Sequence, residues 1–139
     1  MLMNSLFKKT LLSLLLLLLP LTTFAQDDLN IMAKDAIHHD GEYAQVCGVI
    51  AETNYVRGSK GKPTYLNFTR AYPKHNFTVI IWQEDRKNFD FKPESLEGYQ
   101  ACVYGLIDVR KSRPQMIINV QDQISARKVE APQAVEPES

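Results

Sequence analysis

Apolar side chains recur along residues 43–124 in short blocks with a period of two, the spacing that places alternate residues on opposite faces of a β-strand. In residues 64–70, for example, Leu66 and Phe68 fall on one face. Glycine, proline and runs of charged residues separate the blocks, as is typical of turns. The pattern predicts five strands, over residues 43–56, 64–70, 76–83, 99–109 and 115–124.

The stretch between the third and fourth predicted strands has a different composition. Residues 84–98 are rich in charge, contain Pro93 and allow a short helix at 94–96. Strands and helices do not alternate along the chain, which argues against a parallel α/β sheet. Five strands with a helix between strands 3 and 4 is the order of the OB-fold, a partly open Greek-key barrel. We therefore expect an all-β, five-stranded Greek-key OB-fold barrel, with another small β-barrel or a β-sandwich as the alternative.

The N-terminus has the three parts of a secretory signal peptide. Lys8 and Lys9 precede an apolar run over 11–19, and small residues end the segment at Ala25. The alternative is a permanent membrane anchor, but a spanning helix needs roughly 20 apolar residues, and Pro20 interrupts this short run. No cysteine follows the run at a position for a lipid anchor. We expect cleavage after Ala25 and a periplasmic or secreted protein without a stable membrane anchor.

Composition divides the chain further. We expect a signal peptide at 1–25, a leader at 26–40, the OB-fold domain at 41–127 and a disordered tail at 128–139, where prolines and glutamates dominate and no aromatic residue occurs. The formal net charge of the whole chain is zero. Residues 34–128 nevertheless hold 14 basic and 11 acidic residues, so the domain is mildly basic. This balance permits an anionic partner without requiring one.

Cys47 and Cys102 lie in the first and fourth predicted strands, which are antiparallel neighbours in an OB-fold. Alternation places both side chains on the outer face, where they could bridge if they are opposite in register. We expect a structural disulfide, since exported proteins reach oxidising compartments; two free thiols are the alternative. Two cysteines cannot complete a zinc site, and the histidines do not cluster, so we expect no metal or other cofactor.

Two predicted loops are basic and border the strand face on which OB-folds commonly bind ligands. Two aromatic residues in the adjoining strands could stack on bases, as in proteins that bind single-stranded nucleic acid. The alternative is that the basic residues are only solvated and that the tryptophan packs at the rim of the core. The candidate ligand-contact residues are Arg57, Lys60, Lys62, Tyr65, Trp82, Arg110, Lys111 and Arg113.

Several segments resemble a known family. They are the residues at 46–50, 61–68, 72–73, 77–82, 98–107 and 113–118, with a closing pair at 123–124. Together they are similar to small OB-fold, nucleic-acid-binding-like domains that occur alone in exported bacterial proteins or appended to secreted nucleases. The resemblance covers about residues 41–126 and implies the fold more specifically than the function, because one fold hosts many tasks. No nuclease motif accompanies the segments.

These observations lead to a functional hypothesis. The chain contains no evident pair of nucleophile and base, and we expect no enzymatic activity. We expect an exported binding module that holds single-stranded nucleic acid or another polyanion through its two basic loops. The alternative is a protein-interaction module of the cell envelope with no nucleic-acid role.

Overall fold

The computed structural model describes residues 29–130, so the predicted signal peptide, the first residues of the predicted leader (26–28) and most of the predicted tail (131–139) lie outside the described residues. Within this range the chain forms four short 3₁₀ helices: η1 (Ala33–His38), η2 (Gln83–Asn88), η3 (Pro93–Leu96) and η4 (Gln121–Gln123). The remaining regular structure is β, which confirms the all-β class. The strands are β1 (Asn30–Met32), β2 (Tyr43–Tyr55), β3 (Thr64–Phe68), β4 (Phe77–Ile81), β5 (Tyr99–Leu106), β6 (Asp108–Arg110), β7 (Arg113–Ile117) and β8 (Ile124–Lys128).

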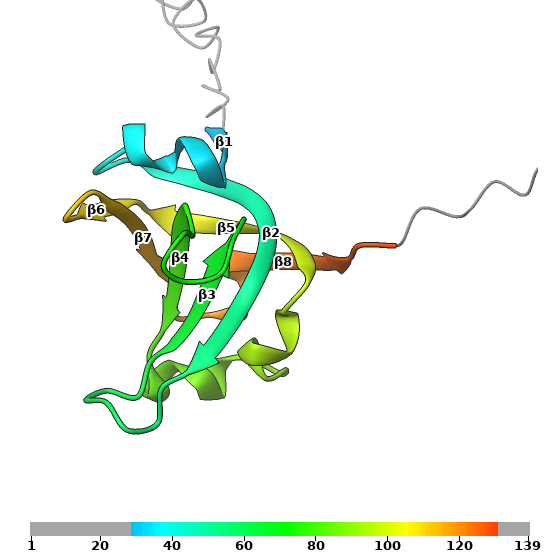
Figure 1. The fold of residues 1–139 in the computed structure, drawn as a ribbon. Helices are drawn as coiled ribbons and strands as arrows, with labels where there is room; N and C mark the ends of the chain where they lie inside the picture. Colours follow the sequence, from blue (N-terminus) through cyan, green and yellow to red (C-terminus); the bar gives the residue numbers. More distant parts are fainter. Residues whose placement is uncertain (1–28, 131–139) are drawn as a thin grey trace, which may run out of the picture.

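The strands form one sheet in the order β6-β7-β4-β3-β2-β5-β8, with β1 paired in parallel to the first half of β2. The long strand β2 bends through the molecule, so that its first half pairs with β5 and its second half with β3 (Figure 1). Most pairs are antiparallel, and β4 pairs with β7 in parallel. The structure therefore differs from the five-stranded barrel expected from the sequence: the described sheet has eight strands, and β6 and β8 are its two open ends.

Two of the additional strands, β8 and β1, have local causes. The fifth predicted strand is divided because the Gln123 side chain accepts hydrogen bonds from the backbone N–H groups of Asn119 (2.9 Å) and Val120 (3.3 Å), which turns the chain at η4. As a result β7 pairs with β4, whereas β8 pairs with β5. Near the N-terminus, the N–H of Gln45 donates to the carbonyl of Leu29 (2.8 Å) and helps to hold β1 against β2.

The core lies inside the curved sheet and consists of the inward residues of the central strands. Phe68 and Phe77 are fully buried and meet edge to face, with their ring centroids 5.4 Å apart. The backbone of β2 approaches the core closely at Gly48, because a Cβ there would be 3.1 Å from both Ala33 and Phe68. The leader residues of η1 therefore pack directly on the core, with Ala33 and Ala36 buried.

A β-bulge in β2 changes which residues face outward. The register shifts between Ile50, which pairs with Phe68, and Glu52, which pairs with Asn67. Before this point the even-numbered residues of β2 face the core, and Ile50 is fully buried. The extra residue, Ala51, reverses the phase, as bulges do. Glu52 and Asn54 are thereby aimed at the outer face of the sheet.

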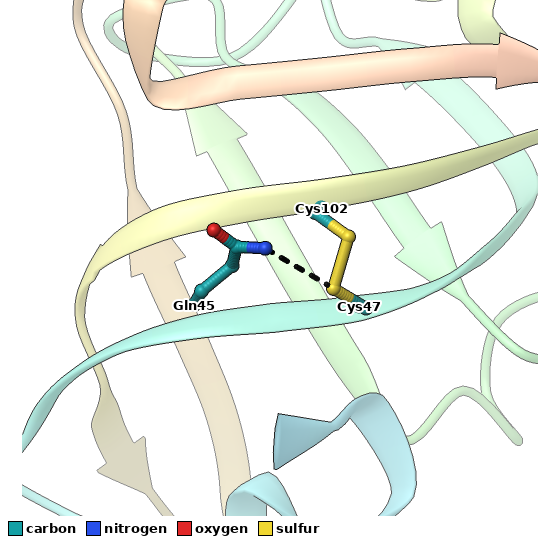
Figure 2. The surroundings of a disulfide bond; sticks show 3 residues. All are labelled: Gln45, Cys47 and Cys102. Atoms are coloured by element: carbon teal, nitrogen blue, oxygen red, sulfur yellow. Dashed lines mark hydrogen bonds between the residues drawn. A yellow bond between two sulfur atoms is a disulfide. The ribbon is translucent and has the colours of Figure 1, made fainter. Parts of the chain in front are cut away.

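The predicted disulfide between Cys47 and Cys102 is confirmed. The two residues are directly opposite in the antiparallel β2–β5 ladder, with their Cα atoms 4.1 Å apart. Figure 2 shows the bridge spanning the two strands beside Gln45, whose amide is 3.7 Å from the Cys47 sulfur. Both cysteines are half-buried on the outer face, as the alternation predicts. The bond is compatible with an oxidising compartment.

Among the described residues, no helix has the length and apolar character that crossing a membrane requires.

Candidate functional site

A groove with a volume of about 440 Å³ crosses the outer face of β2, β3, β4 and β7. The strand register builds its floor from two rows of side chains that run across the strands. The first row is polar throughout and consists of Glu52, Asn67, Thr78 and Gln115. The second row is mainly apolar and consists of Asn54, Tyr65, Ile80 and, beyond the groove, Ile117. A flat ligand with a polar edge could contact both rows at once.

A chain of hydrogen bonds runs along the polar row toward Glu52. The Thr78 hydroxyl donates to Asn67 Oδ1 (3.0 Å), and Asn67 Nδ2 donates to Glu52 Oε2 (2.8 Å). The same carboxylate oxygen accepts the backbone N–H of Tyr72 (2.9 Å). These bonds hold the pKa of Glu52 below its ordinary value, and the bond from the Tyr72 N–H has the largest effect. The row therefore ends on a carboxylate that stays ionised.

The loop between β3 and β4 forms one wall of the groove. Tyr72 is exposed, stacks on the His75 ring with a centroid distance of 5.7 Å, and has the Arg113 guanidinium 5.7 Å from its own ring centre. His75 Nδ1 is buried and has no hydrogen-bond partner among the described residues. This wall offers an aromatic surface beside a cation, and both features suit a planar or anionic ligand.

His75 gives the folding stability a pH dependence. Burial, followed by the nearby Arg113 charge, lowers the pKa of His75 below its ordinary value of 6.5, whereas Glu52 opposes the shift. The unfolded chain therefore binds this proton first as the pH falls below 6.5, and stability declines until the folded state's own pKa is reached. We expect urea unfolding to show lower stability at pH 5.5 than at pH 7, with a smaller difference in His75→Gln. An unchanged pH dependence in that variant would contradict the assignment.

Two of the eight predicted ligand-contact residues line the groove, Tyr65 and Arg113. Arg110 and Lys111 lie in the same tight β6–β7 turn as Arg113, where Lys111 (φ 50°) and the following Ser112 (φ 61°) adopt the left-handed backbone of a type I′ hairpin. Arg110 forms an ion pair with Asp108 of its own strand, which partly neutralises it.

The other basic loop occupies a different place from the one we expected. Arg57, Lys60 and Lys62 lie in the connection between β2 and β3, at the lower end of the strands in Figure 1, whereas the β6–β7 turn lies near the upper end. The two loops therefore do not border one side of a single cleft, because β7 runs parallel to β4 and antiparallel to β3. Basic residues instead flank the strand face at both of its ends.

Trp82 also departs from its predicted role. It is half-buried, and a Cβ on Gly61 would lie 2.9 Å from its ring, so the indole packs under the β2–β3 loop. It does not line the groove. The absence of a Cβ on Gly61 permits this close approach, and its φ of 76° is a second reason for glycine at this position. The structure therefore favours the alternative expectation for this residue, packing at the rim of the core.

The most polar residues of the groove were not predicted as site residues. Asn67 shares a strand face with Tyr65 in the sequence pattern, which was an available signal. The alternation of the strand could not identify Glu52 as a site residue, because the face of the sheet on which Glu52 lies depends on the bulge at Ala51. Within residues 29–130, no three His, Cys, Asp or Glu side chains gather in an arrangement that could hold a metal ion.

Comparisons with known proteins add little. No family model matches this chain, and no curated protein matches it. Among solved structures, a protein assigned as an aspartyl-tRNA synthetase from Leishmania major Friedlin is similar, with a TM-score of 0.46 and 9% sequence identity. The similarity covers 94% of this chain and 28% of that protein, so the chain spans little more than a quarter of its length. A likeness of this size carries no argument about fold or function here.

Proposed function

We propose that the folded part is an OB-fold barrel that binds single-stranded nucleic acid across the groove, and that the protein does so after export. The strand order supports the OB-fold. β2, β3 and β4 form an antiparallel meander, β5 returns to β2, and the last segment contacts both β4 and β5 through β7 and β8. In OB-folds the face of the second and third barrel strands, here β3 and β4, commonly holds the ligand.

The observation that carries the proposal is the groove itself. It combines an exposed aromatic wall, an apolar row around Tyr65 and a polar row, and it lies between basic residues at both ends of the strands. Stacking of a base on an aromatic side chain contributes about 1–3 kcal/mol without demanding a particular base. In this arrangement Tyr65 and Tyr72 contact bases, whereas the β6–β7 turn and the β2–β3 loop contact phosphates.

Titration of the exported protein with a labelled single strand of about ten nucleotides tests the proposal, because OB-folds occupy about 4–16 nucleotides. We expect an affinity that falls as salt rises, since bound phosphates release counterions. Neutralising the hairpin in Lys111→Gln/Arg113→Gln should weaken binding and reduce the log–log salt slope by about 0.7 per lost phosphate contact.

The matched control is Arg127→Gln/Lys128→Gln, which removes the same charge from β8, away from the groove. It should retain the salt slope. Equal losses in both double variants would point to nonspecific attraction. No binding by the folded protein at low salt would overturn the proposal.

A second candidate function is a protein-interaction module of the cell envelope. It is favoured by exposed apolar side chains on the outer face of β2 and β5, where Tyr43 is 66% exposed and pairs with Leu106, and where Tyr104 lies 6.5 Å from the Tyr43 ring. Co-purification of an envelope protein that survives high salt and is lost in Tyr43→Ser would favour this function over the first.

A further inference from the structure

We propose that Glu52 makes the groove selective for bases that carry an exocyclic amino group, with cytosine preferred over uracil or thymine. This inference rests on the proposed function and names the chemical group of the base that the groove would recognise. It depends on the direction in which Glu52 points, on the hydrogen bonds that its carboxylate already makes, and on the charges around it.

The bulge at Ala51 places a carboxylate where regular alternation would not. Glu52 lies in register with Asn67 at the beginning of the polar row, and it lines the groove together with Asn54 of the same strand. Bulges commonly re-aim a side chain beside a functional site. Among the lining residues that the structure describes, Glu52 is the one acidic side chain.

The carboxylate has one oxygen left for a ligand. Both hydrogen bonds to Glu52, from Asn67 Nδ2 and from the Tyr72 N–H, end on Oε2. No hydrogen bond to Oε1 occurs within residues 29–130. The Asn67 amide in turn is occupied on both sides, by Glu52 and by Thr78. The polar row therefore presents an acceptor to the groove, and an ionised acceptor binds donors more strongly than a neutral one does.

The charge of Glu52 also decides which part of a nucleotide faces the floor. A phosphate placed there would meet a like charge, whereas Arg113 at the edge of the groove and Lys111 beside it attract the backbone. Bases are therefore the part that faces the two rows. The apolar row of Tyr65 and Ile80 lies beside the polar one and can pack against a base whose edge reaches Glu52.

Base edges differ in what they offer to this oxygen. Cytosine presents its N4 amino group as a donor, and carboxylates accept from it. Uracil and thymine carry a carbonyl oxygen at the same position, which would face the carboxylate acceptor to acceptor. A hydrogen bond to a charged group contributes enough to change affinity by about tenfold or more.

The test compares oligomers of deoxycytidine and deoxyuridine, about ten nucleotides long, which differ in this exchange of amino and carbonyl groups and in the proton that uracil carries on N3. The wild-type protein should bind the cytosine oligomer about tenfold more tightly. In Glu52→Gln the preference for cytosine should be lost or inverted. The two donors hold the amide oxygen at the Oε2 position, so the NH2 group faces the groove, where it can donate to the uracil carbonyl but cannot accept from cytosine. The matched control is Glu97→Gln: Glu97 also accepts hydrogen bonds from β2, through Thr53, but does not line the groove.

A second measurement does not depend on the variant folding. An oligomer of cytosine with both amino hydrogens replaced by methyl groups should bind the wild-type protein about as weakly as the uracil oligomer. Equal binding of the cytosine and uracil oligomers by wild type, or a preference that survives in Glu52→Gln, would overturn the inference and leave the proposed function standing. Absence of binding to every oligomer would overturn both.

Discussion

Replacing both cysteines in Cys47→Ser/Cys102→Ser is expected to lower the free energy of unfolding by about 4 kcal/mol. The bond joins residues 55 positions apart. In the chain-entropy model, the stabilisation from closing a loop of this length lies between the values for short and for very long loops. Both side chains are half-buried on the outer face, so serine leaves no core cavity. Domains of this size are stable by only about 5–15 kcal/mol in total, so the loss is a large fraction.

Urea unfolding of the oxidised protein and of the double variant measures this loss. Reduced wild-type protein is the control and should unfold at nearly the same urea concentration as the variant, since both lack the cross-link. The loop between the cysteines contains β3, β4, η2 and η3, which include two of the four strands under the groove. A loss below about 1 kcal/mol would mean that the unfolded chain is already constrained in the same way without the bond.

The sequence predicted the first four main strands well because their signal is local. β2, β3, β4 and β5 begin within about a residue of the predicted positions, and each is bounded by turn residues. The disulfide followed from the same alternation, since it placed both cysteines outward on neighbouring strands. The division of the fifth predicted strand into β7 and β8 could not be predicted in this way. The break before β8 depends on Gln123 reaching back to two backbone N–H groups, and no glycine or proline marks it.

The candidate site was only partly predictable, for a related reason. Tyr65 and Arg113 were found because the fold expectation placed their strand and turn beside the ligand face. Continuing the alternation from Val46 past Ile50 would have placed Glu52 in the core, so the bulge at Ala51 hid it. The separation of the two basic loops is a property of the sheet topology, which a list of strands in sequence order does not contain.

Phe68→Ala is expected to lower the free energy of unfolding by about 4 kcal/mol, within the usual range for a buried phenylalanine. Phe68 is fully buried at the end of β3, meets Phe77 edge to face and lies 3.1 Å from the position that a Cβ on Gly48 would take. Truncation leaves a cavity between β2, β3 and β4. The surrounding strands are cross-paired, so they can close this cavity only in part.

Two further variants separate the cavity from a general effect of mutation. Phe68→Leu fills most of the space and should lose less than Phe68→Ala, whereas Ile117→Ala, at a residue that is 49% exposed, should change stability by only about 0.5 kcal/mol. The Phe68 carbonyl also accepts the N–H groups of Arg70 (2.9 Å) and Asn76 (3.3 Å), at the two ends of the loop that carries Tyr72 and His75. We therefore expect Phe68→Ala to increase amide hydrogen exchange in this loop as well. If exchange there stays unchanged while global stability falls, the groove wall is held by Glu52 and Arg113 and does not depend on the core beneath it.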